Sequence, residues 1–200
     1  MCGRYANHVK KMSGWEKILG DWPGTAALSM NIAPTQTIPV VVHLAGVSQA
    51  KNMRWGLVPS WSDTPKPKYA TFNARVETAR QKPSFRNACT KSQACLIPAC
   101  GYYEWSGEKG HKIKHYIQQE DETPLIMAGL WECWTQDEQA LYSCTILTRP
   151  AISLLAEIHP RMPLILSKND AQNWLQQPVN EQLGALQKYE HYPLTVSAPA

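Results

Sequence analysis

Short apolar segments separated by polar turns dominate the pattern of hydrophobic and polar positions along the chain. Several of these segments alternate apolar with polar residues, which is typical of half-buried β-strands. The pattern predicts strands at residues 38–43, 53–58, 94–97, 113–117, 125–131, 141–148 and 163–166. The protein is therefore expected to be built mainly from β-sheet.

Helical signals are fewer and lie between or beside the strands. Apolar residues recur at helical spacing over residues 9–19, and Gly20 can end that helix. Pro83 can begin a second helix, and residues 152–158 predict one or two helical turns. Residues 167–175 predict a further helix that begins with a capping pattern. The whole predicts an α+β fold: one β-rich, barrel-like domain over residues 1–200 with peripheral helices.

Composition agrees with one globular unit. Apolar residues make up 44% and charged residues 18% of the chain, and no repeat or low-complexity block divides it. Lys and Arg outnumber Asp and Glu by 20 to 16, so a polyanionic partner is compatible with the charge but is not required by it. The 8 Trp can serve as core residues or as surfaces that stack on bases.

The beginning of the chain has no apolar signal-peptide segment, and no later run approaches the roughly 18 apolar residues that a membrane helix needs. An intracellular protein without membrane contact, acting as a monomer, is expected. The six cysteines form no CxxC pair, so most of them are expected to be small buried hydrophobic residues. Their spacing with the histidines matches no common zinc pattern, and neither a metal nor a cofactor is expected.

Cys2 has special chemistry because of its position. A small residue after Met1 is the circumstance in which the initiator Met is normally removed, and Cys2 would then carry a free amine beside its thiol. An α-amine has a pKa of about 7.7–8.0 against about 10.4 for Lys, so it is a far better Schiff-base former at neutral pH. Once an aldehyde condenses with the amine, the thiol can close a five-membered thiazolidine ring. The other interpretation is that Cys2 is an incidental second residue.

Three further residues carry groups suited to proton transfer and orientation. Glu104 stands between Tyr103 and Trp105, where an aromatic environment can raise its pKa and make it a proton donor and acceptor, although a solvated strand-end carboxylate fits equally well. His159 can titrate near neutrality, or be structural. Asn73 can orient reacting groups, or hold a turn.

Arginine and tryptophan side chains provide candidate DNA contacts. Asn73 and Arg75 would share one face of an extended segment, so that an amide and a guanidinium point the same way. Arg4 and Arg161 can add phosphate contacts, and Trp61 and Trp105 can stack on unpaired bases. Core packing is the alternative for each Trp.

Several motifs together resemble the SRAP family (SOS response-associated peptidase), whose members process abasic sites. The agreement in number, order and spacing covers most of the chain. The matching stretches are MCGRYA, MNIAPTQ, RWGLVPSW, NARVET, KPSFRNA, CLIPACGYYEW, AGLWE, TILT and IHPRMPLIL.

The resemblance implies a barrel-like α+β fold that captures abasic sites in single-stranded DNA through a thiazolidine at the N-terminal cysteine. It implies that Cys2 is the nucleophile, and that Asn73, Glu104 and His159 assist the chemistry, including strand cleavage by β-elimination. Phosphate contacts would fall on Arg4, Arg75 and Arg161, and base stacking on Trp61. One departure is Cys100, which stands where many relatives have Asp, and a structural change near Glu104 is expected there.

Two alternative functions remain open. A cysteine peptidase acting on itself or on peptides would use Cys2 and His159 as nucleophile and base. A non-catalytic module that binds single-stranded DNA would use the Arg and Trp side chains alone.

Overall fold

The structure is a computed structural model that describes residues 2–7, 29–108, 110–186 and 193–197. The helix predicted at residues 9–19 lies outside these ranges. No helix in the described part of the chain is both long and apolar enough to cross a membrane.

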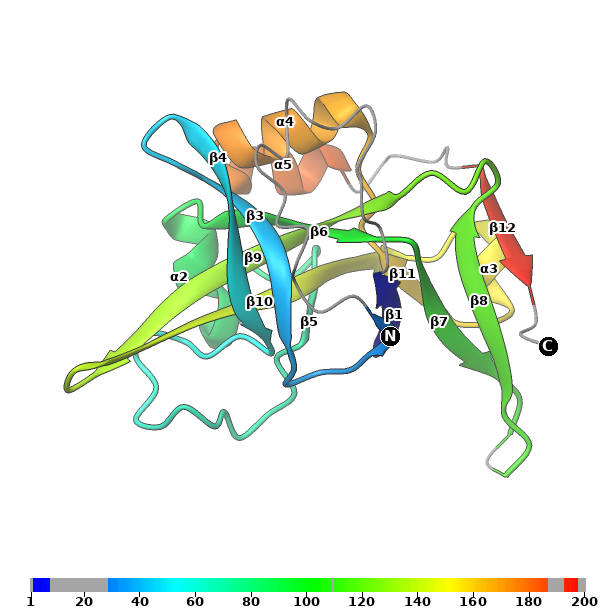
Figure 1. The fold of residues 1–200 in the computed structure, drawn as a ribbon, viewed down its shortest axis with the longest axis horizontal. Helices are drawn as coiled ribbons and strands as arrows, with labels where there is room; N and C mark the ends of the chain where they lie inside the picture. Colours follow the sequence, from blue (N-terminus) through cyan, green and yellow to red (C-terminus); the bar gives the residue numbers. More distant parts are fainter. Residues whose placement is uncertain (1, 8–28, 109, 187–192, 198–200) are drawn as a thin grey trace.

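Among the described residues, five long strands close into a barrel (Figure 1). β3 pairs antiparallel with β4 and β6, β6 with β9, and β9 with β10, while β10 returns to β4 in a parallel pair. The ring has no free edge, and the barrel-like expectation is confirmed. Its strands are β3 (Thr37–Leu44), β4 (Val47–Trp55), β6 (Ala94–Ala99), β9 (Leu125–Gln136) and β10 (Gln139–Pro150). Two short strands pair with β10, namely β5 (Asn73–Arg75) and β11 (Arg161–Pro163).

A second sheet lies beside the barrel and contains the beginning of the chain (Figure 1). As far as the described residues define it, its order is β12, β8, β7, β1, β2. The register aligns Tyr5 with Tyr102 and Tyr102 with Ile117, so these three buried side chains share one face. The strands are β1 (Arg4–Asn7), β2 (Ser29–Ile32), β7 (Gly101–Ser106), β8 (Ile113–Gln119) and β12 (Leu194–Ser197).

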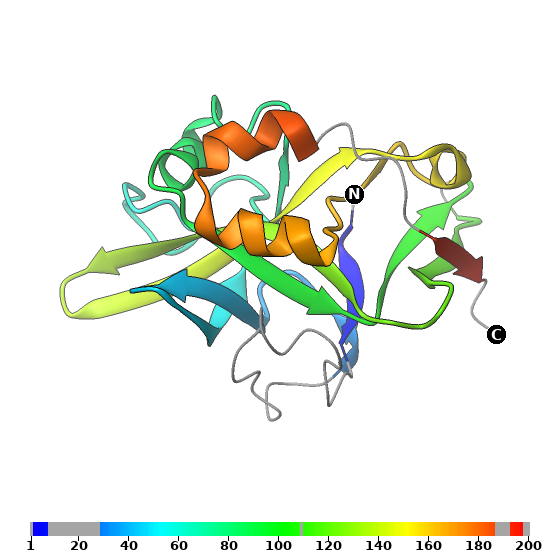
Figure 2. The same ribbon diagram turned by 90° about the horizontal axis from the view of Figure 1, so that it is seen from above.

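Helices cover one outer face of the barrel, as the view in Figure 2 shows for α4 and α5. The predicted cap is present, because Ser167 Oγ accepts a hydrogen bond from the Asp170 backbone at 3.2 Å. The Trp174 indole donates to the carbonyls of Cys95 and Gly129, which fixes α4 against the barrel. The helices are α2 (Pro83–Thr90), α3 (Ser153–Ala156), α4 (Lys168–Gln176) and α5 (Val179–Leu186).

Two apolar clusters occupy the two sides of the barrel wall. Along β6, Leu96 belongs to the cluster that contains the buried residues of α2, α4 and α5, whereas Cys95 and Ile97 belong to the other. Because helices cannot fit inside a five-stranded ring, the second cluster is the interior one. This interior cluster continues into the second sheet and includes Tyr5 and Cys2. The fold therefore buries Cys2 at the junction of barrel and sheet.

The predicted strands are all found, with shifted boundaries. The strand predicted at 53–58 begins earlier and ends at Trp55, where Gly56 adopts a φ of +128°. The strand predicted at 163–166 is instead Arg161–Pro163, followed by an isolated bridge from Ile165 to Met127. Four unpredicted strands, β1, β2, β5 and β12, have only three or four residues. Such short strands carry too few positions to establish a period of two. The pattern also missed β7 and α5.

Candidate functional site

Cys2 is held in the interior by a side chain from the barrel. The Asn73 amide nitrogen donates a hydrogen bond of 2.7 Å to the Cys2 carbonyl, and both residues are buried. Asn73 begins β5, which pairs in parallel with β10 at Ile146. The barrel wall thus determines where the Cys2 backbone lies.

Asn73 and Arg75 occupy the same short strand, as predicted from the sequence. The two side chains therefore share one face, and they differ in burial: Asn73 is buried, whereas Arg75 is exposed. The side-chain amide oxygen of Asn73, Oδ1, is buried and has no hydrogen-bond partner among the described residues. An acceptor beside Cys2 is therefore available.

Glu104 lies in β7 on the same face as Tyr102, within electrostatic range of Cys2. Burial raises the pKa of the Glu104 carboxyl above its ordinary value, and the positive charge of His159 partly offsets this. The carboxyl therefore keeps its proton to a higher pH than an exposed Glu does. A raised pKa favours a role of this carboxyl as a proton donor.

His159 and Glu104 both line a small depression, whose lining also includes Tyr102 and Arg161. It follows α3, and its backbone nitrogen donates to the Leu155 carbonyl at 2.9 Å. Its Nδ1 lies 3.0 Å from both the backbone nitrogen and the backbone carbonyl oxygen of Arg161. The side chain is half-buried.

The Cys2 thiol is in an environment that keeps it protonated. Burial raises its pKa well above the ordinary value for a cysteine, and the nearby Glu104 charge raises it further. The thiol hydrogen points to the Arg4 carbonyl at a sulfur–oxygen distance of 3.8 Å. The neutral thiol is therefore the resting form at this position, and a thiolate there is disfavoured.

Arg161 uses its guanidinium within the protein. Its two terminal nitrogens donate to both carboxylate oxygens of Glu77 at 2.6 and 2.9 Å, and one also donates to the Thr148 carbonyl at 2.6 Å. This bidentate pair connects β11 to the segment after β5, and so positions His159 relative to Asn73. Glu77 was not predicted from the sequence, although the NARVET and IHPRMPLIL motifs contain the two partners. Phosphate contact by Arg161 stays a prediction.

Arg4 and Trp105 lie away from the buried carboxylate. The register pairs Arg4 with Tyr103, and side chains alternate along β7, so Arg4, Tyr103 and Trp105 share the face opposite to Glu104. Both Arg4 and Trp105 are half-buried. The structure therefore does not gather them with Cys2, and their DNA contacts stay predictions.

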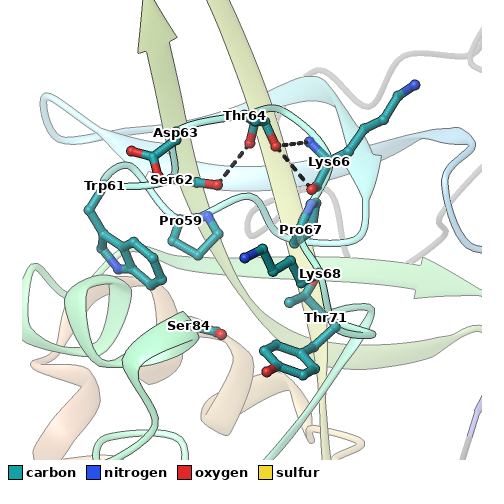
Figure 3. A pocket seen from close by; sticks show the side chains of 11 residues that line it. Pro59, Trp61, Ser62, Asp63, Thr64, Lys66, Pro67, Lys68, Thr71 and Ser84 are labelled. Atoms are coloured by element: carbon teal, nitrogen blue, oxygen red, sulfur yellow. Dashed lines mark hydrogen bonds between the residues drawn. The ribbon is translucent and has the colours of Figure 1, made fainter.

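Trp61 lies on the surface, and 60% of it is exposed. Its indole nitrogen donates to the Pro83 carbonyl at 3.3 Å, which holds the ring beside the start of α2 (Figure 3). Core packing, the alternative for this residue, is thereby excluded.

The cysteines lie in the described part of the chain and none forms a disulfide. All but Cys133 are buried, which confirms that most act as small hydrophobic residues. Cys100 lies at the junction of β6 and β7, where its backbone nitrogen donates to the Ala6 carbonyl at 2.8 Å. Burial raises the pKa values of Tyr103 and Tyr116, and the nearby Cys100 thiol raises them further.

Comparison with known proteins identifies the family. The family model described as SOS response associated peptidase (SRAP) matches residues 1–198. The chain belongs to the SRAP family. Abasic site processing protein YoqW of Bacillus subtilis strain 168 is 38% identical over 182 residues, which cover 88% of this chain and 80% of that protein.

Other SRAP relatives extend the likeness in sequence and in structure. Abasic site processing protein HMCES of Xenopus tropicalis is 32% identical over 178 residues, covering 74% of this chain and 53% of that protein. A crystal structure from Bordetella bronchiseptica superimposes with a TM-score of 0.85 at 28% identity, and the match covers 100% of both chains. The family and the β-rich fold implied by the sequence motifs are confirmed.

Proposed function

We propose that this chain processes abasic sites in single-stranded DNA by forming a thiazolidine from Cys2 after removal of Met1. The names of its SRAP relatives support the substrate. The observation that carries the proposal is the 2.7 Å hydrogen bond from Asn73 to the Cys2 carbonyl, because it holds Cys2 near Glu104, and Glu104 in turn interacts with His159.

The amine of Cys2 reacts first, because burial keeps the thiol protonated. The neutral amine adds to the aldehyde carbon of the opened sugar and gives a carbinolamine. Loss of the hydroxyl as water leaves a protonated imine. The sulfur then bonds to the imine carbon, the C=N bond becomes a single C–N bond, and the thiol proton is released. The net reaction joins protein and DNA with loss of one water.

Glu104 and His159 divide the proton transfers. The protonated Glu104 carboxyl donates to the departing hydroxyl of the carbinolamine, and the resulting carboxylate can accept the thiol proton. His159 exchanges protons between this buried carboxyl and solvent. In the lyase branch a base takes the proton next to the imine carbon and the C3′–O bond breaks, so the phosphate departs with its electron pair.

Asn73 orients the amine. Its side-chain nitrogen donates a hydrogen bond to the Cys2 carbonyl. Its side-chain oxygen Oδ1 can accept a hydrogen bond from the N–H of the amine or the carbinolamine. Arg75 lies on the same strand face and is exposed, which suits a phosphate next to the lesion. Trp61 suits stacking on a base, and Arg4, Arg161 and Trp105 are proposed as secondary DNA contacts.

The peptidase alternative has weaker support. A cysteine peptidase needs a nucleophile whose thiol pKa is lowered, and burial raises the pKa of Cys2. Self-removal of Met1 would require only one turnover and does not conflict with this environment.

A comparison of three single strands tests the proposal. Mature protein is mixed with an intact strand, a strand with one abasic site, and a strand with a tetrahydrofuran, which lacks the aldehyde. We expect a heat-stable adduct with the abasic strand alone. Protein with an extra residue before Cys2 should bind all three strands and give no adduct. Equal noncovalent affinity for the three strands without any adduct would instead select the DNA-binding module.

A further inference from the structure

A second histidine lies beside Glu104 in the sheet that contains β7 and β8, two neighbouring strands in Figure 1. The antiparallel register places His115 of β8 directly opposite Glu104 of β7. Residues opposed in this way share one face of the sheet, and their Cβ atoms are about 4.5–5.5 Å apart. His115 is therefore an immediate neighbour of the residue whose carboxyl is proposed to transfer protons.

A hydrogen bond to Ser106 fixes the His115 ring on this face. His115 Nε2 lies 2.7 Å from Ser106 Oγ. Side chains alternate along β7, so Ser106 shares the face of Glu104. Glu104 is buried there, whereas Ser106 and His115 are half-buried. The imidazole thus retains contact with water at the edge of the buried site.

The described strands around His115 add no other charged side chain to its face. Lys114, the preceding residue of β8, points to the opposite face, where its ammonium lies 4.0 Å from the centroid of the Tyr103 ring. Arg4 of β1 is on that opposite face as well. β12 borders β8 on its other side and is uncharged over Leu194–Ser197. Within this sheet, the charge that can act on Glu104 is that of His115.

Three further ionisable groups approach Glu104 from outside the sheet. The Cys2 thiol interacts with it electrostatically, but burial keeps that thiol protonated. Arg161 lines the same depression and is already engaged in an ion pair. His159 interacts with Glu104 through its positive charge. The carboxyl therefore has an imidazole on its own sheet and a second one from the segment after α3.

The charge of an imidazole next to a carboxyl depends on pH in a useful range. An ordinary imidazole is positive below about pH 6.5 and neutral above it. A positive neighbour favours the ionised form of a carboxyl, and a neutral neighbour does not. A histidine opposite Glu104 therefore makes the carboxyl a readier proton donor in acid, and lets it keep its proton when the histidine is neutral.

We propose that His115 acts through Glu104 as a pH-sensitive positioning residue: the charge on its ring determines how readily the Glu104 carboxyl gives up its proton. Ser106 holds the ring opposite the carboxyl. The inference rests on the proposed function for the role of Glu104. It adds a residue that touches no substrate and links the reaction to pH.

Two substitutions separate the charge of His115 from its shape. His115→Gln can keep a hydrogen bond to Ser106 and is neutral at every pH, whereas His115→Lys is positive throughout the neutral range. The Glu104 carboxyl is followed by carbon-13 NMR in mature protein without DNA. It should titrate at a lower pH in His115→Lys than in His115→Gln, because only lysine keeps the positive charge.

The crosslinking rate at saturating abasic strand should follow the same charge. The parent protein should react like His115→Lys at about pH 5.5 and like His115→Gln at about pH 8, because its own imidazole changes charge between the two. The two variants should differ by about two- to tenfold at each pH, the effect of one charge across a partly solvated contact. A merely structural role would slow both variants by the same factor at every pH.

The matched control is His111→Gln, because His111 is an exposed histidine in the turn between β7 and β8. It should leave the Glu104 titration and the crosslinking rate as in the parent. An identical Glu104 titration in the parent, His115→Gln and His115→Lys would overturn the inference. A titration that follows the charge at position 115, in a protein that never crosslinks, would uphold the coupling and reject the thiazolidine chemistry. Normal crosslinking at a rate that ignores this charge would reject the inference alone.

Discussion

Cys2→Ala removes the heat-stable adduct with abasic DNA and leaves a weaker, reversible one. The variant keeps a free α-amine at the same position after Met1 is removed, so an imine still forms. Without sulfur the ring cannot close, and the imine hydrolyses on heating. The expected result is no adduct after heating and a trapped adduct after borohydride reduction, both measured by intact mass.

Cys133→Ala is the control for this substitution, because Cys133 is a half-buried cysteine on β9 that lies away from the site. It should crosslink as the parent protein does. A heat-stable adduct in full yield from Cys2→Ala would mean that another residue is the nucleophile.

Glu104→Gln slows crosslinking by about a hundredfold, within the range that general acid–base catalysis supplies. Gln keeps the shape of the side chain and cannot donate the carboxyl proton, so affinity for the tetrahydrofuran strand should be unchanged. Single-turnover rates at saturating abasic strand measure the effect. The exposed Glu108, replaced by Gln, is the matched control and should react at the parent rate.

The pH profile shows whether Glu104 acts through its proton. The parent rate requires both the neutral Cys2 amine, whose ordinary pKa is about 7.7–8.0, and the protonated Glu104 carboxyl, so it should rise and then fall as the pH increases. Because burial raises the pKa of Glu104, the carboxyl keeps its proton to a higher pH than an exposed one does. Glu104→Gln should keep the rise and lose the fall. An unchanged rate and profile would remove Glu104 from the mechanism.

The sequence predicts the long elements well because their periodicity spans enough residues. Strands such as β9 and β10 extend over 12 residues each, and their apolar runs identify them. Closure of the barrel is different, since it depends on the parallel pairing of β10 with β4 at Cys144 and Trp55. Pairing between residues so far apart in the chain leaves no local pattern.

In the candidate site, too, some features have a local signal in the sequence and others depend on contacts between distant segments. The proposed roles of Cys2, Asn73 and Glu104 follow from residue type and motif, and the fold brings these residues together. The environment of each group cannot be predicted from the sequence. The ion pair between Arg161 and Glu77, for example, joins two segments that meet only in the folded chain. The side of the sheet on which Arg4 lies depends on register, and so it too required the structure.

The account depends on both nucleophiles of Cys2 bonding to the same aldehyde carbon, and the mass of the adduct tests this directly. Mature protein that has reacted with an abasic strand is measured before and after borohydride treatment. A thiazolidine has no C=N bond, so the mass should equal protein plus DNA less one water and should not change on reduction. A gain of two hydrogens by the whole adduct would show an open imine, and would contradict ring closure by the Cys2 sulfur.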